Sequence, residues 1–175
     1  MPKHQEKIKN GFTLIELLVA MAIFSVVILT AVSIFTVGMG GTKKIFGQQA
    51  VQESGRFILE SISKEIRMSE VNGLNGTLLA SLPDGLSGPY ASLRIINADK
   101  QTIDYIFNEA DKQVSRAGSV LNPNDINASG KFYLLKNGNL QPRITVILGL
   151  ASKTEEKYRA AINLQTTASS REYAQ

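Results

Sequence analysis

The 175-residue sequence contains no cysteine and no tryptophan, and its only histidine is His4, in a polar tract near the start. Without cysteine the chain has no disulfide scaffold, no thiolate zinc site and no cysteine nucleophile. Because this is the only histidine and lies in such a tract, the sequence lacks the residues for a Ser-His-Asp triad or a histidine-based metal site. We therefore expect no enzyme activity, no metal and no cofactor.

One long segment carries no charge: residues 17–42 are 26 consecutive uncharged positions. A bilayer core about 30 Å thick requires about 20 helical residues, and residues 17–37 supply 21. A secretory signal peptide is one alternative, but its apolar region is usually about 7–15 residues long and ends at a small-residue cleavage site. A buried core helix is the other, although such a run is long for a small soluble domain. The segment predicts a membrane-spanning helix.

The formal net charge is +4. Three lysines precede the apolar run, and this basic tract favours an N terminus in the cytoplasm with the C-terminal domain outside. Beyond the run, the charges alternate in sign and form no basic cluster. We therefore expect no nucleic-acid partner.

After the apolar run the pattern predicts more helix and then strands. Apolar residues recur at steps of three and four at Val51, Ile58, Leu59, Ile62 and Ile66, which extends a helix from Phe12 to about Ser69. Period-two alternation then predicts five strands, at residues 93–95, 103–107, 132–135, 144–150 and 160–166. This order indicates an α+β fold, with an antiparallel sheet packed on the amphipathic half of the helix.

The connecting segments are predicted from their turn residues. Asp99-Lys100 and Asn137-Gly138 mark turns between strands. Residues 72–88 are rich in glycine and serine, and Asp84-Gly85 and Gly88-Pro89 lie at or near their end, so a mobile loop is expected there. The cluster of Asn122, Asn124, Asp125 and Asn127 has a single carboxylate. It is interpreted as a turn, because calcium usually takes about six to eight oxygen ligands.

Glu16 lies where the apolar run begins. A carboxylate inside a bilayer costs a few kcal/mol unless it is paired or close to the interface. The residues alone leave two interpretations open. Either Glu16 sits at headgroup depth, or it meets a cationic partner when the helix enters a protein assembly.

The residues around Glu16 carry a motif: Lys9-Asn10-Gly11-Phe12-Thr13-Leu14-Ile15-Glu16-Leu17-Leu18-Val19-Ala20. It resembles the prepilin leader of type IV pilins and type II secretion pseudopilins. The resemblance implies that a prepilin peptidase cuts between Gly11 and Phe12 and methylates the new amine of Phe12. It also implies that Glu16 pairs with the terminal amine of a neighbouring subunit.

The resemblance divides the chain into a leader (1–11), a transmembrane and filament-core helix (12–41) and a periplasmic or extracellular α+β domain (42–175). The implied partners are the peptidase, other pilin or pseudopilin subunits, an inner-membrane assembly platform, and the lipid bilayer before assembly. Many major type IV pilins close their C-terminal region with a disulfide, so the absence of cysteine favours a pseudopilin or a minor pilin. The spacing of Tyr105 before Arg116, and of Arg143 before Arg171, is also similar to that of minor pilins and pseudopilins.

We expect the protein to be a minor structural subunit of a type IV pilus or a type II secretion pseudopilus. One alternative is a binding module displayed on a filament, such as an adhesin or a DNA-uptake pilin. For that role Tyr105, Arg116, Lys131 and Tyr133 are too scattered to define a groove. The other is a membrane-anchored enzyme, for which residues 61–64 offer only a Ser-x-x-Lys spacing on a helix.

Overall fold

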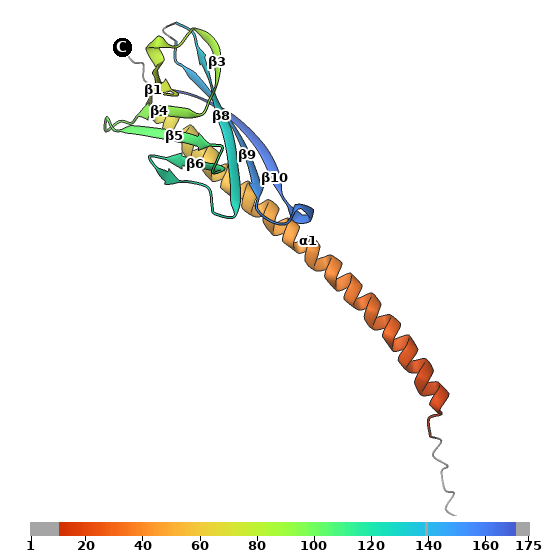
Figure 1. Ribbon diagram of the computed structural model, residues 1–175. Helices are drawn as coiled ribbons and strands as arrows, with labels where there is room; N and C mark the ends of the chain where they lie inside the picture. Colours follow the sequence, from red (N-terminus) through yellow and green to blue (C-terminus); the bar gives the residue numbers. More distant parts are fainter. Residues whose placement is uncertain (1–10, 139, 171–175) are drawn as a thin grey trace, which may run out of the picture. The chain divides into compact units, whose positions relative to one another are not determined.

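A computed structural model describes residues 11–138 and 140–170 of the protein. Residues 1–10 of the predicted leader, and Arg171 of the predicted minor-pilin spacing, lie outside the described residues. The elements run in the order α1 (Leu14–Met68), β1 (Glu70–Leu74), β2 (Thr77–Leu78), η1 (Leu79–Ser81), β3 (Gly85–Tyr90), β4 (Ser92–Ile96), β5 (Thr102–Asn108), β6 (Gln113–Arg116), β7 (Ser119–Val120), β8 (Ile126–Lys136), β9 (Arg143–Ser152), η2 (Glu156–Tyr158) and β10 (Ala161–Ser169). The fold is α+β (Figure 1).

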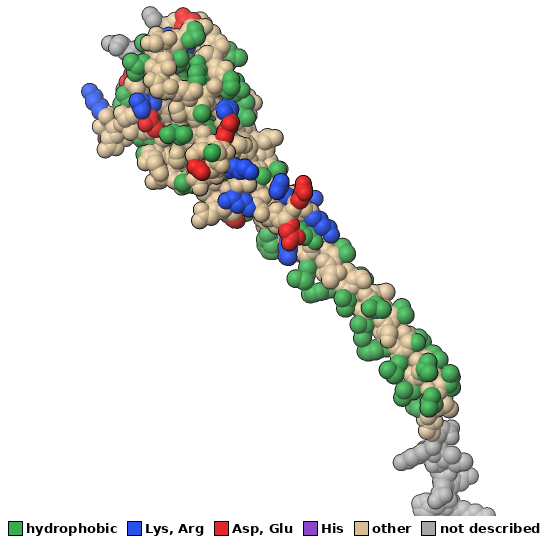
Figure 2. All heavy atoms as spheres, in the orientation of Figure 1, with side chains coloured by type: hydrophobic (Ala, Val, Ile, Leu, Met, Phe, Trp, Pro, Cys, Tyr) green, Lys and Arg blue, Asp and Glu red, His purple; other side chains and the backbone are tan. Residues whose placement is uncertain are grey.

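The chain divides into two compact units, Met1–Thr42 and Lys43–Gln175. In the described part of the first unit every side chain is exposed or nearly so, and most are apolar. Figure 2 shows apolar side chains along the part of the helix that belongs to this unit. A helix that is apolar all round requires lipid or protein around it.

In the second unit, α1 buries a single stripe of side chains. Val51, Ile58, Ile62 and Ile66 are each at most 1% exposed. They recur at steps of seven and four, which places them on one face of a helix. Gly55 lies on the same face, where a methyl group would come within 2.6 Å of Leu164 Cδ1 on β10. Its missing side chain therefore lets the helix approach the strand closely.

The strands form two antiparallel sheets. One sheet has six strands in the order β2-β1-β4-β5-β6-β7, and the other has four in the order β10-β9-β8-β3. Strand β8 also contacts β4, β5 and β6, and so joins the sheets. At this junction Gly130 leaves room for the Phe107 ring, which lies 4.9 Å from the ring of Phe132.

The inward faces of both sheets and the stripe of α1 form one hydrophobic core. Ile144, Val146, Leu148 and Leu150 alternate with more exposed residues along β9, as the period-two pattern predicts. The five predicted strands correspond to β4, β5, β8, β9 and β10. The turn at Lys100 is confirmed by its positive φ and by its N–H bond to the Asn97 carbonyl.

Two expectations need correction. The predicted mobile loop at residues 72–88 is wrong, because β1, β2, η1 and most of β3 occupy this segment. Gly73 allows close strand pairing here, because a Cβ at this position would collide with the Thr77 carbonyl oxygen, where the chain turns from β1 into β2. The helix also begins at Leu14 instead of Phe12, for a reason found at its N terminus.

Candidate functional site

The N terminus of α1 is closed by a reciprocal capping box. Glu16 Oε2 accepts hydrogen bonds from the Thr13 backbone N–H and from Thr13 Oγ1, both at 2.9 Å. In return, Glu16 N–H donates to Thr13 Oγ1 at 3.3 Å. A threonine at the N-cap and a glutamate three residues later form this arrangement because each satisfies a donor that the helix leaves unpaired. Thr13 is therefore the last residue before the helix.

This capping role of Glu16 is an addition to the two interpretations that the sequence left open. The Thr-x-x-Glu spacing at residues 13–16 was visible in the sequence and is a known signal for a helix start. Such a cap contributes about 1 kcal/mol, because the first backbone N–H groups of a helix have no partner within the helix.

The predicted cleavage residues lie just outside the helix. Gly11 and Phe12 have no helical assignment, and the side chain of Phe12 is 85% exposed. A methyl group at Gly11 would meet no atom within 4 Å. Phe12 and Glu16 also line the same shallow hollow of about 370 Å³, together with Ile15, Val19, Ala20 and Ile23. The structure thus brings the proposed methylation site and the proposed pairing residue to one surface.

The apolar stretch that follows is suited to an environment without water. Its hydroxyl groups bond to carbonyls one turn earlier, as in Ser25 to Met21, Thr30 to Val27 and Ser33 to Leu29, each at 2.8 Å. Such bonds satisfy polar side chains without any outside partner. The helix is long and apolar enough to cross a membrane, and its most apolar window is not buried in the protein.

A second polar cluster joins α1 to the six-stranded sheet. Glu65 accepts hydrogen bonds from Tyr105 Oη and Arg116 Nε, both at 2.8 Å, and pairs with an Arg116 guanidinium nitrogen at 2.6 Å. Tyr105 and Arg116 are partners across β5 and β6. Burial raises the pKa of Tyr105 to about 12, so the phenol stays protonated and donates to Glu65. The same carboxylate raises the pKa of Arg116.

The other residues weighed for function lie apart from these clusters. Lys131 on β8 pairs with Glu109 at 2.6 Å. Asn122 is buried, where its amide oxygen accepts from Val114 N–H and its amide nitrogen donates to the Ile126 carbonyl at 2.7 Å. Asn124 and Asp125 are exposed beside it. Residues 11–138 and 140–170 contain no group of three or more His, Asp or Glu side chains arranged to hold a metal.

Comparison with known proteins agrees with the N-terminal geometry. Residues 7–32 match the family model of the prokaryotic N-terminal methylation motif. No curated protein and no solved structure matches the chain. The matched segment contains the predicted cleavage residues, the capping box and the start of the apolar helix. This motif and the apolar helix that carries it support the resemblance of the N-terminal segment to type IV pilins and pseudopilins.

Proposed function

We propose that the protein is a minor structural subunit of a type IV pilus or a type II secretion pseudopilus, and that it performs no catalysis itself. The observation that carries this proposal is the N terminus. An exposed Gly11-Phe12 pair leads directly into a capped helix that is apolar on every side. Such a helix fits the inner membrane before assembly and the interior of a filament afterwards.

In this proposal a prepilin peptidase removes residues 1–11 and methylates Phe12. The basic tract keeps the leader in the cytoplasm, and the domain from Lys43 onward lies in the periplasm or outside the cell. An inner-membrane assembly platform then transfers the helix from lipid to neighbouring subunits. The exposed position of Gly11 supports this order, because the cut site is accessible before the helix enters an assembly.

Glu16 has two tasks in this account. Its Oε2 closes the capping box, whereas Oε1 makes no hydrogen bond to the described residues. An ionised carboxylate has about four lone-pair positions, so Oε1 can accept the amine of Phe12 from a neighbouring subunit. Two charges that are each costly in an apolar interior become tolerable as a pair.

Two substitutions separate these tasks. Glu16→Gln keeps an acceptor for the cap, since glutamine also forms capping boxes, but it removes the charge. Thr13→Val keeps the shape of residue 13 and the charge of Glu16, but it removes the capping hydroxyl. Breaking a buried ion pair costs about 3–5 kcal/mol, whereas losing a cap costs about 1 kcal/mol.

We expect Glu16→Gln to lower incorporation into sheared filaments at least tenfold, because 1.4 kcal/mol corresponds to about that factor. Thr13→Val should lower it by less than about tenfold. Quantitative immunoblotting of filament and membrane fractions measures both. Normal incorporation of Glu16→Gln would reject the pairing role. A larger loss for Thr13→Val than for Glu16→Gln would show that the cap matters more than the charge.

A further inference from the structure

Four strands form the edges of the two sheets, and three of them carry features that hinder pairing with another chain. Strands β2 and β7 are two residues long. Strand β3 contains Pro89 and a register shift between Ser87 and Tyr90. Shortness, proline and bulges are the usual ways in which proteins protect sheet edges. Strand β10 is different, because its nine residues contain no proline and no charge, and its pairing with β9 is regular.

The backbone groups on the free side of β10 can be assigned from the ladder. Ser152 N–H bonds to the Ala160 carbonyl at 2.8 Å, and Ser170 N–H bonds to the Pro142 carbonyl at 3.3 Å. In a regular antiparallel pair the residues that bond across the ladder alternate with those that do not. The even-numbered residues of β10 therefore face β9. The N–H and C=O groups of Asn163, Gln165 and Thr167 are left at the open edge.

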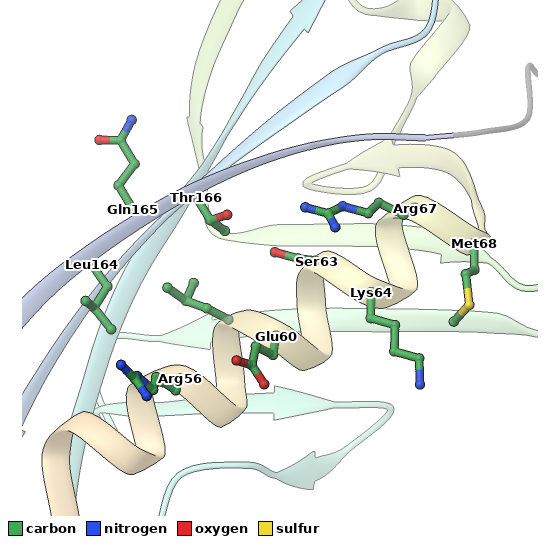
Figure 3. Close-up of a pocket in the computed structure, with 10 residues that line it drawn as sticks. Arg56, Glu60, Ser63, Lys64, Arg67, Met68, Leu164, Gln165 and Thr166 are labelled. Carbon is green, nitrogen blue, oxygen red and sulfur yellow. The ribbon is translucent and has the colours of Figure 1, made fainter. Parts of the chain in front are cut away.

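A groove of about 700 Å³ runs between this part of β10 and α1 (Figure 3). Leu59 and Leu164 contribute apolar surface to it. Arg56, Lys64 and Arg67 line it from the helix, and Figure 3 shows Lys64 and Arg67 close together, with Arg56 nearer the N-terminal end of this part of α1. All three are exposed, and none forms an ion pair with a described carboxylate. Glu60 is the carboxylate among the lining residues, so cations predominate.

We propose that this groove binds an extended, acidic segment of a neighbouring protein, which adds a strand to β10. The backbone of such a segment would bond to the open N–H and C=O groups. Side chains alternate between the two faces of a strand, so the face turned toward α1 would carry carboxylates that meet the three cations beside Leu59 and Leu164. A second copy of this chain fits less well, because it would bring the same three cations to the interface.

A peptide-binding experiment tests the proposal on the full chain in phosphatidylcholine nanodiscs. The probe is a fluorescein-labelled peptide of about nine residues, the length of β10, with alternating valine and glutamate. Its matched control replaces each glutamate by lysine. We expect the acidic probe to bind at least tenfold more tightly by fluorescence anisotropy, a difference of about 1.4 kcal/mol. The protein with Arg56→Glu and Lys64→Glu should lose this preference.

Strand addition is tested through the probe, so that the fold of the protein is unchanged. N-methyl groups on alternate residues of the acidic peptide remove the N–H groups along one edge and leave the other edge intact. One of the two possible methylation patterns should abolish binding, and the other should retain it. A protein variant gives the same comparison from the other side: Gln165→Pro should weaken binding at least about tenfold, and Gln165→Ala should not.

Three results would overturn the proposal. One is equal binding of the acidic and the basic probe, and another is equal binding of both N-methylated probes and the unmethylated one. The third is a second copy of the chain as the occupant. Because the sequence has no cysteine, Gln165→Cys introduces a single thiol, and an efficient disulfide dimer through it would assign the groove to self-association. The assay requires neither leader cleavage nor Glu16, so its failure is distinct from failure of the proposed filament function.

Discussion

Replacing Glu65 by alanine tests how α1 is held against the six-stranded sheet. The carboxylate of Glu65 is the partner of both Tyr105 and Arg116, and its side chain is 20% exposed. Removing it leaves the hydroxyl of Tyr105 without this acceptor in the core, where the residue has no exposed surface. An unsatisfied buried donor costs about 1–3 kcal/mol.

Arg116 contributes less to this loss. Its side chain is 37% exposed, so water replaces much of what Glu65 provides, and exposed ion pairs contribute about 1 kcal/mol at most. The two effects together predict that Glu65→Ala lowers the free energy of unfolding by about 1–4 kcal/mol. Glu65→Gln is the matched control, since its amide oxygen still accepts from Tyr105 while the charge is lost. Its cost should be about 1 kcal/mol or less.

Urea unfolding of the full chain in nanodiscs, followed by circular dichroism of the β-rich unit, measures these differences through the midpoint at constant slope. An alanine variant as stable as the wild type would show that the hydroxyl of Tyr105 finds another partner. Equal losses for the alanine and glutamine variants would show that the charge, and not the buried hydrogen bond, provides the stability. Either result would refute the reasoning about burial.

Two further predictions concern the core. Gly130→Ala would place a methyl group 2.5 Å from the Ile147 carbonyl oxygen and 2.6 Å from the Phe107 ring, and should lower stability by about 1–3 kcal/mol in the same urea assay. Gly47→Ala is its control, because a methyl group there has no neighbour closer than 3.7 Å, and in a helix it should raise stability by about 0.5–1 kcal/mol. The second prediction is a loss of stability at alkaline pH, because the pKa of Tyr105 is raised from about 10 in the unfolded chain to about 12. The contribution is complete below about pH 10 and falls by about 2–3 kcal/mol as pH approaches 12, and Tyr105→Phe should flatten this dependence in urea titrations.

The main features of the fold could be predicted because they depend on local periodicity. Two patterns indicated which face is buried: the stripe from Val51 to Ile66 and the alternation along β9. Both were found as predicted. Strands β1 and β3 could not be found in this way. Their short, glycine-containing sequences resemble loops, and only pairing with β4 and β8 makes them strands.

The polar clusters show the same limit. The capping box at Thr13 and Glu16 involves residues three apart, so its signal was present in the sequence and was missed. The bonds from Glu65 to Arg116 span 51 positions and require the register of β5 and β6 as well as the packing of α1. The open edge of β10 likewise exists only because the sheet ends there.

The central claim is that this chain is processed as a pilin, and intact-mass measurement after co-expression with a prepilin peptidase tests it most directly. The account predicts loss of residues 1–11 and a gain of about 14 Da for one methyl group on Phe12. Gly11→Val should block both changes without harming the fold, because a side chain at Gly11 meets no atom within 4 Å. Gly38→Ala, at a glycine that is equally free of neighbours, should be processed like the wild type. An unchanged mass of the wild-type chain in the presence of active peptidase would contradict the account.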